Sequence, residues 1–96
     1  MELLVTYDVD TTDRHGERRL RQVAKICEGI GCRVQKSVFE VVCNPVQHVY
    51  LEAALRETMD HERDSVRIYR LDQGSFAAAH HLGASIAPIH RGPLIV

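Results

Sequence analysis

The sequence predicts an α+β domain of the ferredoxin-like type, in which two helices cover one face of an antiparallel sheet. Two observations lead to this fold class. Segments with strand periodicity and segments with helix periodicity follow one another in the order β-α-β-β-α-β. The 96 residues suffice for one domain, because two halves would each be too small to bury a stable core. We therefore expect a single domain over residues 1–96, in which residues 72–96 form a C-terminal extension associated with a dimer.

The first predicted strand covers Leu3 to Val9, because apolar and polar side chains alternate there with a period of two. The odd-numbered residues should face one side, and Leu4, Thr6 and Asp8 the other. Residues 11–13 (Thr-Thr-Asp) should cap a helix, since their side-chain oxygens can accept hydrogen bonds from its first backbone amides.

The first predicted helix runs from about Arg14 to Ile30, and its two faces differ in character. The apolar face is Leu20, Val23, Ala24 and Cys27, and the opposite, mostly basic face is Arg18, Arg21, Gln22 and Lys25. Gly29 and Gly31 are expected to end the helix, because glycine adopts a left-handed cap without strain.

The segment from Arg33 to Cys43 is extended but too long for one average strand. We expect two strands that meet in a bend near Ser37, or one strand with a bulge there. A second helix follows, with Asn44 as its cap and Gln47 completing a capping box, and it should reach about Met59. Its expected apolar face is Val46, Val49, Tyr50, Ala53 and Leu55 or neighbouring residues.

Residues Ser65 to Leu71 alternate again and predict the last strand of the sheet, with Val66 and Ile68 on one side. Helices on one side of a sheet leave its other face uncovered. The simplest cover is a second copy of the chain, so we expect a homodimer. The three β-formers Leu94-Ile95-Val96 indicate an added C-terminal strand that helps to hold this dimer. The alternative is a disordered tail on a monomer.

The net charge of −1 hides an asymmetry along the chain. Seven basic and two acidic residues lie from Arg14 to Lys36, a local balance of +5, while the stretch from Glu40 to Asp64 has a balance of −4. A basic patch on a near-neutral protein indicates an anionic partner such as a phosphate backbone, although a solvated helix face gives the same pattern. Aromatic residues make up 5% and Trp is absent, which disfavours recognition of single-stranded bases by stacking.

The three cysteines, an odd number, argue against a disulfide framework and for a reducing, cytoplasmic compartment. No apolar run is long enough to span a membrane, and the first residues do not resemble a signal peptide. Neither the six histidines nor the cysteines have the spacing of a zinc site. A glycine-rich phosphate loop is absent as well, which disfavours a small-molecule sensor.

Asp8 is the first candidate for chemistry, because it lies near the end of the first predicted strand. A twofold axis on the uncovered face would bring its carboxylate close to that of a second copy. Two such like charges are unfavourable unless a cation bridges them, and Mg²⁺ or Mn²⁺ takes oxygen ligands of this kind. Such an ion can activate water for attack on a phosphodiester. The alternative is that Asp8 only ends the strand; Asp10 would share its side if the strand continued.

Three stretches taken together resemble one known family, the small CRISPR-associated Cas2 proteins. They are Leu4-Val5-Thr6-Tyr7-Asp8-Val9, Arg33-Val34-Gln35-Lys36-Ser37-Val38-Phe39-Glu40 and Asp64-Ser65-Val66-Arg67-Ile68-Tyr69-Arg70-Leu71. The resemblance covers about residues 2–71, and the tail from Gly92 to Val96 is similar to the variant that accompanies subtype I-C systems. It implies a ferredoxin-like homodimer whose sheets pack face to face, with a C-terminal strand that crosses to the partner.

The resemblance also implies an activity and a site. Many members are described as metal-dependent endonucleases that cut single-stranded RNA or double-stranded DNA. The implied metal ligand is Asp8, one from each protomer, and Arg33, Ser37 and Phe39 are implied around the site. Arg33 would stabilise an anionic transition state by charge, and Ser37 would position a phosphate oxygen. Asp10 resembles a second acid seen in some members.

A non-catalytic role is implied as the alternative. A dimer of the family bridges two dimers of the spacer integrase and holds the duplex that is inserted into the repeat array. In that role the basic helix face would meet phosphates without reading bases, through Arg14, Arg18, Arg21 and Lys25. The sequence favours neither role, because both use the same dimer.

Overall fold

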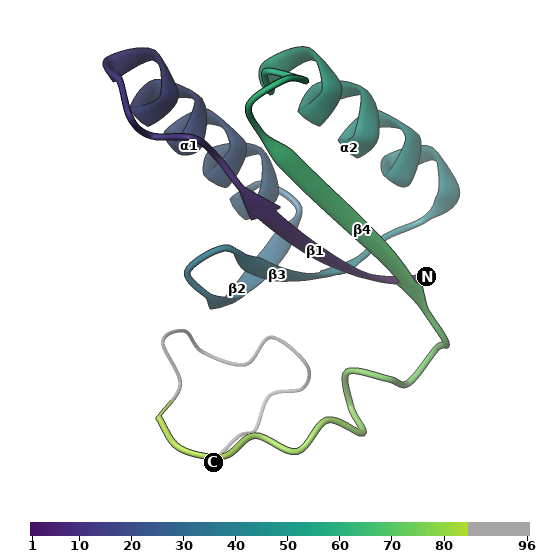
Figure 1. The fold of residues 1–96 in the computed structure, drawn as a ribbon. Coiled ribbons are helices and arrows are strands. Elements are labelled where there is room, and N and C mark those ends of the chain that lie inside the picture. Colours follow the sequence, from purple (N-terminus) through teal and green to yellow (C-terminus); the bar gives the residue numbers. More distant parts are fainter. Residues whose placement is uncertain (85–96) are drawn as a thin grey trace.

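The computed structural model describes residues 1–84, which contain two helices and four strands (Figure 1). In chain order they are β1 (Glu2–Asp8), α1 (Arg14–Glu28), β2 (Gly31–Gln35), β3 (Val38–Val42), α2 (Pro45–Thr58) and β4 (Ser65–Leu71). The predicted βαββαβ order is therefore confirmed. The bend expected near Ser37 is the turn between β2 and β3.

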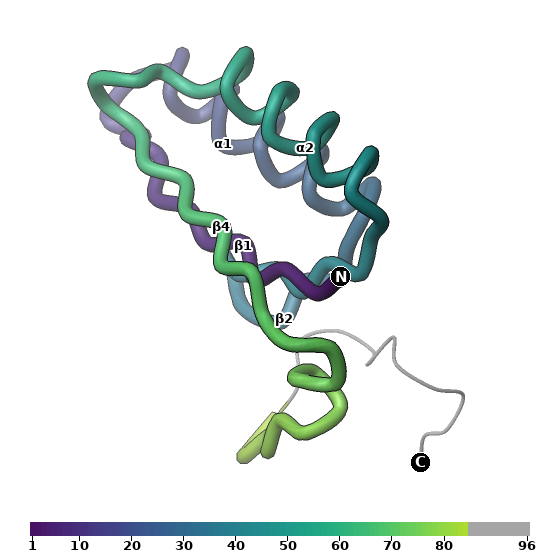
Figure 2. Tube along the Cα trace, turned by 90° about the vertical axis from the view of Figure 1, so that its right-hand side faces the viewer, coloured from purple at the N-terminus to yellow at the C-terminus, as the bar shows by residue number. Residues whose placement is uncertain are grey.

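The four strands form one antiparallel sheet in the order β2-β3-β1-β4. On β1, Val5 lies opposite Phe39 of β3 and Ile68 of β4, so these three side chains point to the same face. Both helices lie on that face, and the other face carries no helix (Figure 2). The fold is the predicted α+β, ferredoxin-like arrangement.

The core lies between the helices and the sheet. It contains side chains of both helices and of the three strands β1, β3 and β4, with Leu3, Val5, Val23, Cys27 and Phe39 fully buried. On β1 the alternation is the predicted one, because the odd-numbered residues are buried while Leu4 and Thr6 are half-buried and Asp8 is exposed. Burial of this apolar surface is the main force that holds the helices on one face of the sheet.

The expected apolar face of the second helix is wrong for most of its residues. Val46, Val49 and Tyr50 are 61%, 66% and 71% exposed, whereas Leu51 and Leu55 are buried. The helix begins where expected, because Asn44 and Gln47 form the predicted capping box. One row of apolar residues on α2 contains Val46, Val49 and Tyr50, and another contains Leu51 and Leu55. Packing against the sheet buries the second row.

Two glycines have a different function from the expected one. Gly29 follows α1 in a right-handed conformation (φ −69°, ψ −17°), so the helix does not end in a left-handed cap. Gly31 begins β2, where a Cβ would lie 2.7 Å from the carbonyl oxygen of Glu40. A third glycine permits closer contact still: a Cβ on Gly16 would lie 1.8 Å from the carbonyl oxygen of Asp10. Glycine at position 16 therefore allows the first turn of α1 to pack directly on the segment that leaves β1.

The described part of the C-terminal extension, residues 72–84, turns at Gly74 as expected (φ +93°). The carboxylate of Glu2 accepts hydrogen bonds from the backbone amides of Gly74 at 2.7 Å and Phe76 at 2.8 Å. The expected C-terminal strand at Leu94-Ile95-Val96, and the tail from Gly92 to Val96, lie outside the described residues. Neither helix among residues 1–84 has the length and apolar character needed to cross a membrane.

A buried ion pair ties the end of β1, the helix α1 and the start of β4 together. The carboxylate of Asp64 is fully buried and accepts a hydrogen bond from Arg19 Nε at 2.7 Å. It also accepts hydrogen bonds from the backbone amides of Asp60, at 2.8 Å, and of Asp10, at 3.1 Å. Burial disfavours the charged carboxylate, but these donors outweigh it and hold the pKa of Asp64 below its usual range.

Replacing this carboxylate should destabilise the fold. We expect Asp64→Asn to lower the free energy of unfolding at pH 7 by about 3 kcal/mol, because Arg19 is left without its charged partner. A group whose folded pKa is lowered stabilises the protein above its unfolded pKa, about 4, and this contribution is lost as the pH falls through the folded value. Urea denaturation at several pH values should therefore show the wild type and the variant converging in acid. Glu62→Gln, an exposed change in the same loop, is the control.

Candidate functional site

Asp8 lies at the end of β1, on the face of the sheet that no helix covers. It is opposite Ser65 of β4 and on the same side as Leu4 and Thr6. Its side chain is exposed, and within residues 1–84 no hydrogen bond or ion pair engages its carboxylate. An exposed carboxylate without a partner in the described residues, on a sheet face that also carries apolar side chains, is available to bind a cation or a second molecule.

The structure does not bring Arg33 and Phe39 to Asp8. Phe39 is fully buried on the helix side of the sheet, and the Arg33 guanidinium lies 5.2 Å from the centre of its ring. Arg33 also forms an ion pair with Glu28 of α1, at 3.1 Å. Both residues thus face away from Asp8 within one chain. Together they connect β2, β3 and α1.

Ser37 lies at the same end of β1 as Asp8. Its carbonyl oxygen accepts a hydrogen bond from the backbone amide of Tyr7 at 3.1 Å, one residue before Asp8. The hydroxyl of Tyr7 donates to the carbonyl oxygen of Lys36 at 3.4 Å, which holds the same turn from the helix side. Of the three residues predicted around the site, Ser37 is therefore the one that the fold places near the end of β1.

Asp10 is not a second acid beside Asp8. The strand β1 ends at Asp8. The carboxylate of Asp10 accepts hydrogen bonds from the hydroxyl of Thr12 at 2.7 Å and from Arg63 Nε at 3.0 Å. Arg63 also pairs with Asp13, at 3.1 Å. The hydrogen bonds from Thr12, and then that from Arg63, hold the pKa of Asp10 far below its usual range. Asp10 is thus engaged in closing the loop between β1 and α1.

The described part of one chain offers few protein ligands for a divalent ion. Within residues 1–84 no three side chains of the ligand types His, Cys, Asp or Glu gather in one place. Asp8 supplies a single carboxylate, whereas Mg²⁺ is usually bound by one or two carboxylates together with waters and substrate phosphates. The Asp8 of a second copy would bring the number of carboxylates at such a site to two.

Arg67 and Tyr69 also lie on the face of Asp8, and the sequence analysis did not name them as candidates. Arg67 of β4 lies opposite Thr6, on the same face as Asp8, and donates a hydrogen bond to the hydroxyl of Tyr69 at 2.9 Å. Its guanidinium is 5.9 Å from the ring centre of Tyr69. The sequence pattern indicated their placement, because the alternation that puts Val66 and Ile68 on one side of the strand puts Arg67 and Tyr69 on the other.

The basic face of α1 points away from the sheet, and therefore away from Asp8. Arg18, Arg21 and Lys25 line one shallow, open groove on the helix surface, and Arg14 is exposed one turn before them. The buried side chains of α1, Val23 and Cys27 among them, lie on the opposite side of the helix. Within residues 1–84 none of the four cations forms an ion pair, so their charges are available to an external anion.

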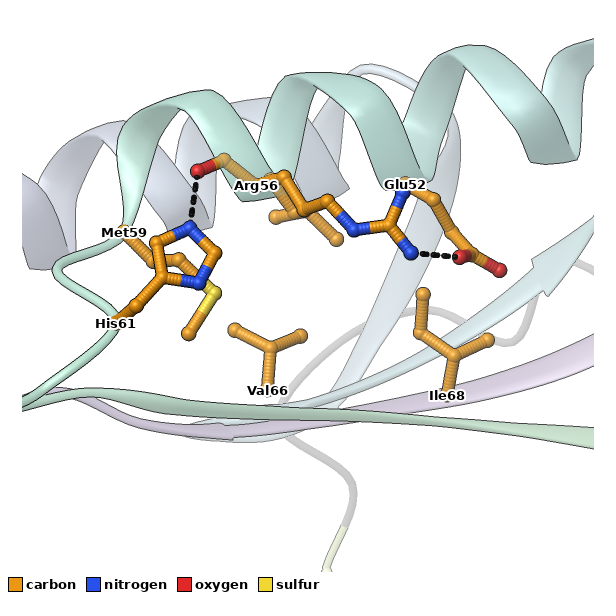
Figure 3. A pocket seen from close by; sticks show the side chains of 7 residues that line it. Glu52, Arg56, Met59, His61, Val66 and Ile68 are labelled. Carbon is orange, nitrogen blue, oxygen red and sulfur yellow. Dashed lines mark hydrogen bonds and ion pairs between the residues drawn. The ribbon is translucent and has the colours of Figure 1, made fainter.

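A small cavity of about 210 Å³ lies between α2 and β4, on the helix side (Figure 3). Its polar groups already have partners: His61 Nε2 is 2.9 Å from the carbonyl oxygen of Arg56, and Arg56 is 3.3 Å from Glu52. Val66 and Ile68 form its floor, as Figure 3 shows. These contacts close the end of α2 over the edge strand, so the cavity offers no free group for catalysis.

Comparison with known proteins identifies the family. The family model described as "CRISPR associated protein Cas2" matches residues 1–79. The "CRISPR-associated endoribonuclease Cas2 3" of Rhodospirillum rubrum is 48% identical over 94 residues, which are 98% of this chain and 99% of that protein. The "CRISPR-associated endonuclease Cas2" of Halalkalibacterium halodurans is 43% identical over 95 residues, 99% of each chain.

A solved structure agrees with this result. The crystal structure of Streptococcus pyogenes Cas2 at pH 6.5 superposes with a TM-score of 0.78 and 42% sequence identity, covering 86% of this chain and 100% of that one. The sequence resemblance, the topology and the matched length point the same way. The chain belongs to the CRISPR-associated Cas2 family of endoribonucleases and endonucleases.

Proposed function

We propose that the chain is a metal-dependent endonuclease that works as a twofold dimer, with Asp8 from both copies at a shared site. The observation that carries this proposal is the exposed Asp8 carboxylate, which has no partner within residues 1–84 and lies on the uncovered sheet face. The relatives include an endoribonuclease and an endonuclease, which supports a nucleic-acid substrate, and the proposed substrate is RNA or double-stranded DNA.

The uncovered face supports the dimer. Apolar side chains lie on it beside polar ones: Val42 is 58% exposed, Tyr69 is 42% exposed, and Leu4 and Val38 are half-buried. A face of this composition gains free energy when a second surface covers it. A second copy supplies the same face, and a twofold axis near the ends of the β1 strands would pair the two Asp8 carboxylates.

The dimer is tested by placing a charge on this face. We expect Val38→Glu to give a monomer, because the new carboxylate would be buried opposite the partner sheet. Size-exclusion chromatography with light scattering measures the mass, and circular dichroism verifies that the fold is kept. Val49→Glu is the matched control, since Val49 is 66% exposed on α2 and away from the sheet face. Equal dimerisation of both variants would contradict the proposed interface.

The proposed cofactor is Mg²⁺ or Mn²⁺, held by the two Asp8 carboxylates. When bound, such an ion lowers the pKa of a coordinated water and stabilises charge on a phosphoryl oxygen. Hydrolysis itself adds water across one P–O bond: the water oxygen bonds to phosphorus, and the leaving nucleoside oxygen takes up a proton. The chain's own contribution is to hold two carboxylates on a rigid sheet, with Ser37 as a predicted contact to a phosphate oxygen at the same end.

The catalytic role of Asp8 is tested by Asp8→Asn. We expect cleavage of RNA and of duplex DNA to fall at least about a hundredfold, because the amide keeps the shape but not the charge that binds a divalent ion. Activity should depend on added Mg²⁺ or Mn²⁺ and disappear with chelator. The fold should persist, since no hydrogen bond or ion pair within residues 1–84 involves the Asp8 carboxylate, and we expect the dimer to persist with it. Undiminished cleavage by this variant would reject the proposed active site.

A second candidate function is a scaffold that holds duplex DNA for the spacer integrase. One observation favours it: Arg14, Arg18, Arg21 and Lys25 share an outer helix face and have no ion-pair partner within residues 1–84. In a dimer joined through the uncovered sheet faces, α1 of each copy would lie on the outside. The two helices would then present cations to a phosphate backbone without any contribution from Asp8.

The scaffold is tested by removing charge from α1. The triple variant Arg18→Gln, Arg21→Gln, Lys25→Gln should bind duplex DNA more weakly and with a smaller salt dependence, because each lost phosphate contact lowers the salt slope by about one. Spacer acquisition in cells should fail with this variant and survive Asp8→Ala. The opposite pattern, in which acquisition tolerates the triple variant but not Asp8→Ala, would favour the enzyme alone.

A further inference from the structure

We propose that Arg67 binds the substrate phosphate beside Asp8. It would supply the positive charge that the family resemblance implied for Arg33. The inference rests on the proposed nuclease function, since it names a substrate contact of that same site. It concerns β4, the strand that neighbours β1 at the edge of the sheet.

The strand register places Arg67 next to Asp8. Asp8 lies opposite Ser65, and Thr6 lies opposite Arg67, so Arg67 is the diagonal neighbour of Asp8 on the adjacent strand. Diagonal neighbours on one face of an antiparallel pair have their backbones about 7–8 Å apart, within reach of long side chains. The guanidinium of Arg67 therefore reaches a phosphate beside Asp8, whose own carboxylate would meet that phosphate only through a bound cation.

The chemistry of Arg67 suits this contact. Arginine is charged at all relevant pH values, and its planar fork of N–H donors matches the oxygens of a phosphate. The side chain is exposed, and within residues 1–84 it pairs with no carboxylate. One N–H, on Nη1, donates to Tyr69, which leaves further donors for an anion. Tyr69 thus orients the guanidinium without neutralising it.

Other arginines near the ends of the sheet are engaged or face elsewhere. Arg33 pairs with Glu28 and lies over Phe39 on the helix side. Arg63 is held between Asp10 and Asp13. Arg70 lies on the same strand as Arg67 but opposite Leu3, so it belongs to the helix-facing side.

The charge balance of the site also requires a cation from the protein. Two Asp8 carboxylates and an incoming phosphodiester bring three negative charges together, and one divalent ion neutralises only two of them. A single Arg67 on the same face would supply the remaining positive charge. This charge is present before any metal binds, so it should contribute to substrate binding without metal.

The experiment measures binding separately from cleavage. All variants are made in the Asp8→Asn background and are titrated into fluorescently labelled RNA and duplex DNA in the presence of chelator, with anisotropy as the readout. We expect Arg67→Gln to weaken binding about tenfold and to lower the salt slope by about one, as for loss of a phosphate contact. Arg70→Gln is the matched control, with the same charge change on the other face of the same strand, and should stay within about twofold.

Two further variants separate a phosphate contact from a structural role. Arg67→Lys keeps the positive charge but lacks the planar set of N–H donors of a guanidinium. The variant should therefore keep the salt slope and bind nucleic acid about threefold more weakly. Tyr69→Phe keeps the ring but removes the hydroxyl that accepts from Arg67, so it should show a smaller loss in the same direction. Light scattering on each variant shows whether the dimer is intact. If Arg67→Gln dissociates the dimer, the comparison of Arg67→Lys with wild-type Arg67 decides the result.

The outcomes distinguish this inference from the proposed function. Equal binding by Arg67→Gln and Arg70→Gln would overturn the inference even if Asp8 proves essential for cleavage. An unchanged affinity and salt slope for both Arg67→Gln and Arg67→Lys would do the same. A specific loss with Arg67→Gln supports the phosphate contact. If the protein with Asp8 intact does not cleave RNA or DNA, the proposed catalysis is wrong. The phosphate contact of Arg67 is still supported in that case, because it is measured by binding.

Discussion

The ion pair between Asp64 and Arg19 is the constraint on which the rest of the structure depends. It is buried, and the same carboxylate also binds backbone amides from the segments that follow β1 and α2. A buried charge that lost its partner would cost several kcal/mol, so these segments are held together. The consequence for function is positional, because the pair fixes where β1 ends and where β4 begins. Asp8 and Ser65 face one another at that point.

The fold separates two kinds of surface. Helices on one side of the sheet turn the basic face of α1 outward, while Asp8 and Arg67 lie on the other side. A sheet-to-sheet dimer would place the carboxylates inside and the helix cations outside. Hydrolysis at the shared acid site and scaffolding along the helices would then use different parts of one assembly. The two proposed roles would therefore use separate surfaces of one chain.

The motif residues around Asp8 show how a shared sequence pattern combines architecture with chemistry. Arg33 and Phe39 stack on each other on the helix side, and Arg33 reaches Glu28 of α1. They hold the β2–β3 hairpin against the core. The cation that shares a face with Asp8 comes instead from β4, at Arg67. Asp10, close to Asp8 in sequence, is likewise engaged by Thr12 and Arg63. Neither membership of the shared motif, for Arg33 and Phe39, nor nearness in sequence, for Asp10, places a side chain beside Asp8 within the chain.

The sequence by itself determined the order of elements, the buried face of β1, a helix cap within residues 11–13, the cap at Asn44 and the exposure of Asp8. These features follow from periodicity and from hydrogen bonds between near neighbours, which a sequence displays directly. Only the tertiary structure decided which stripe of α2 is buried, which arginine lies beside Asp8 and what Asp10 contacts. Those features depend on the packing of elements that are far apart in the chain. Local patterns leave several packings open, and burial together with charge pairing between distant segments selects one.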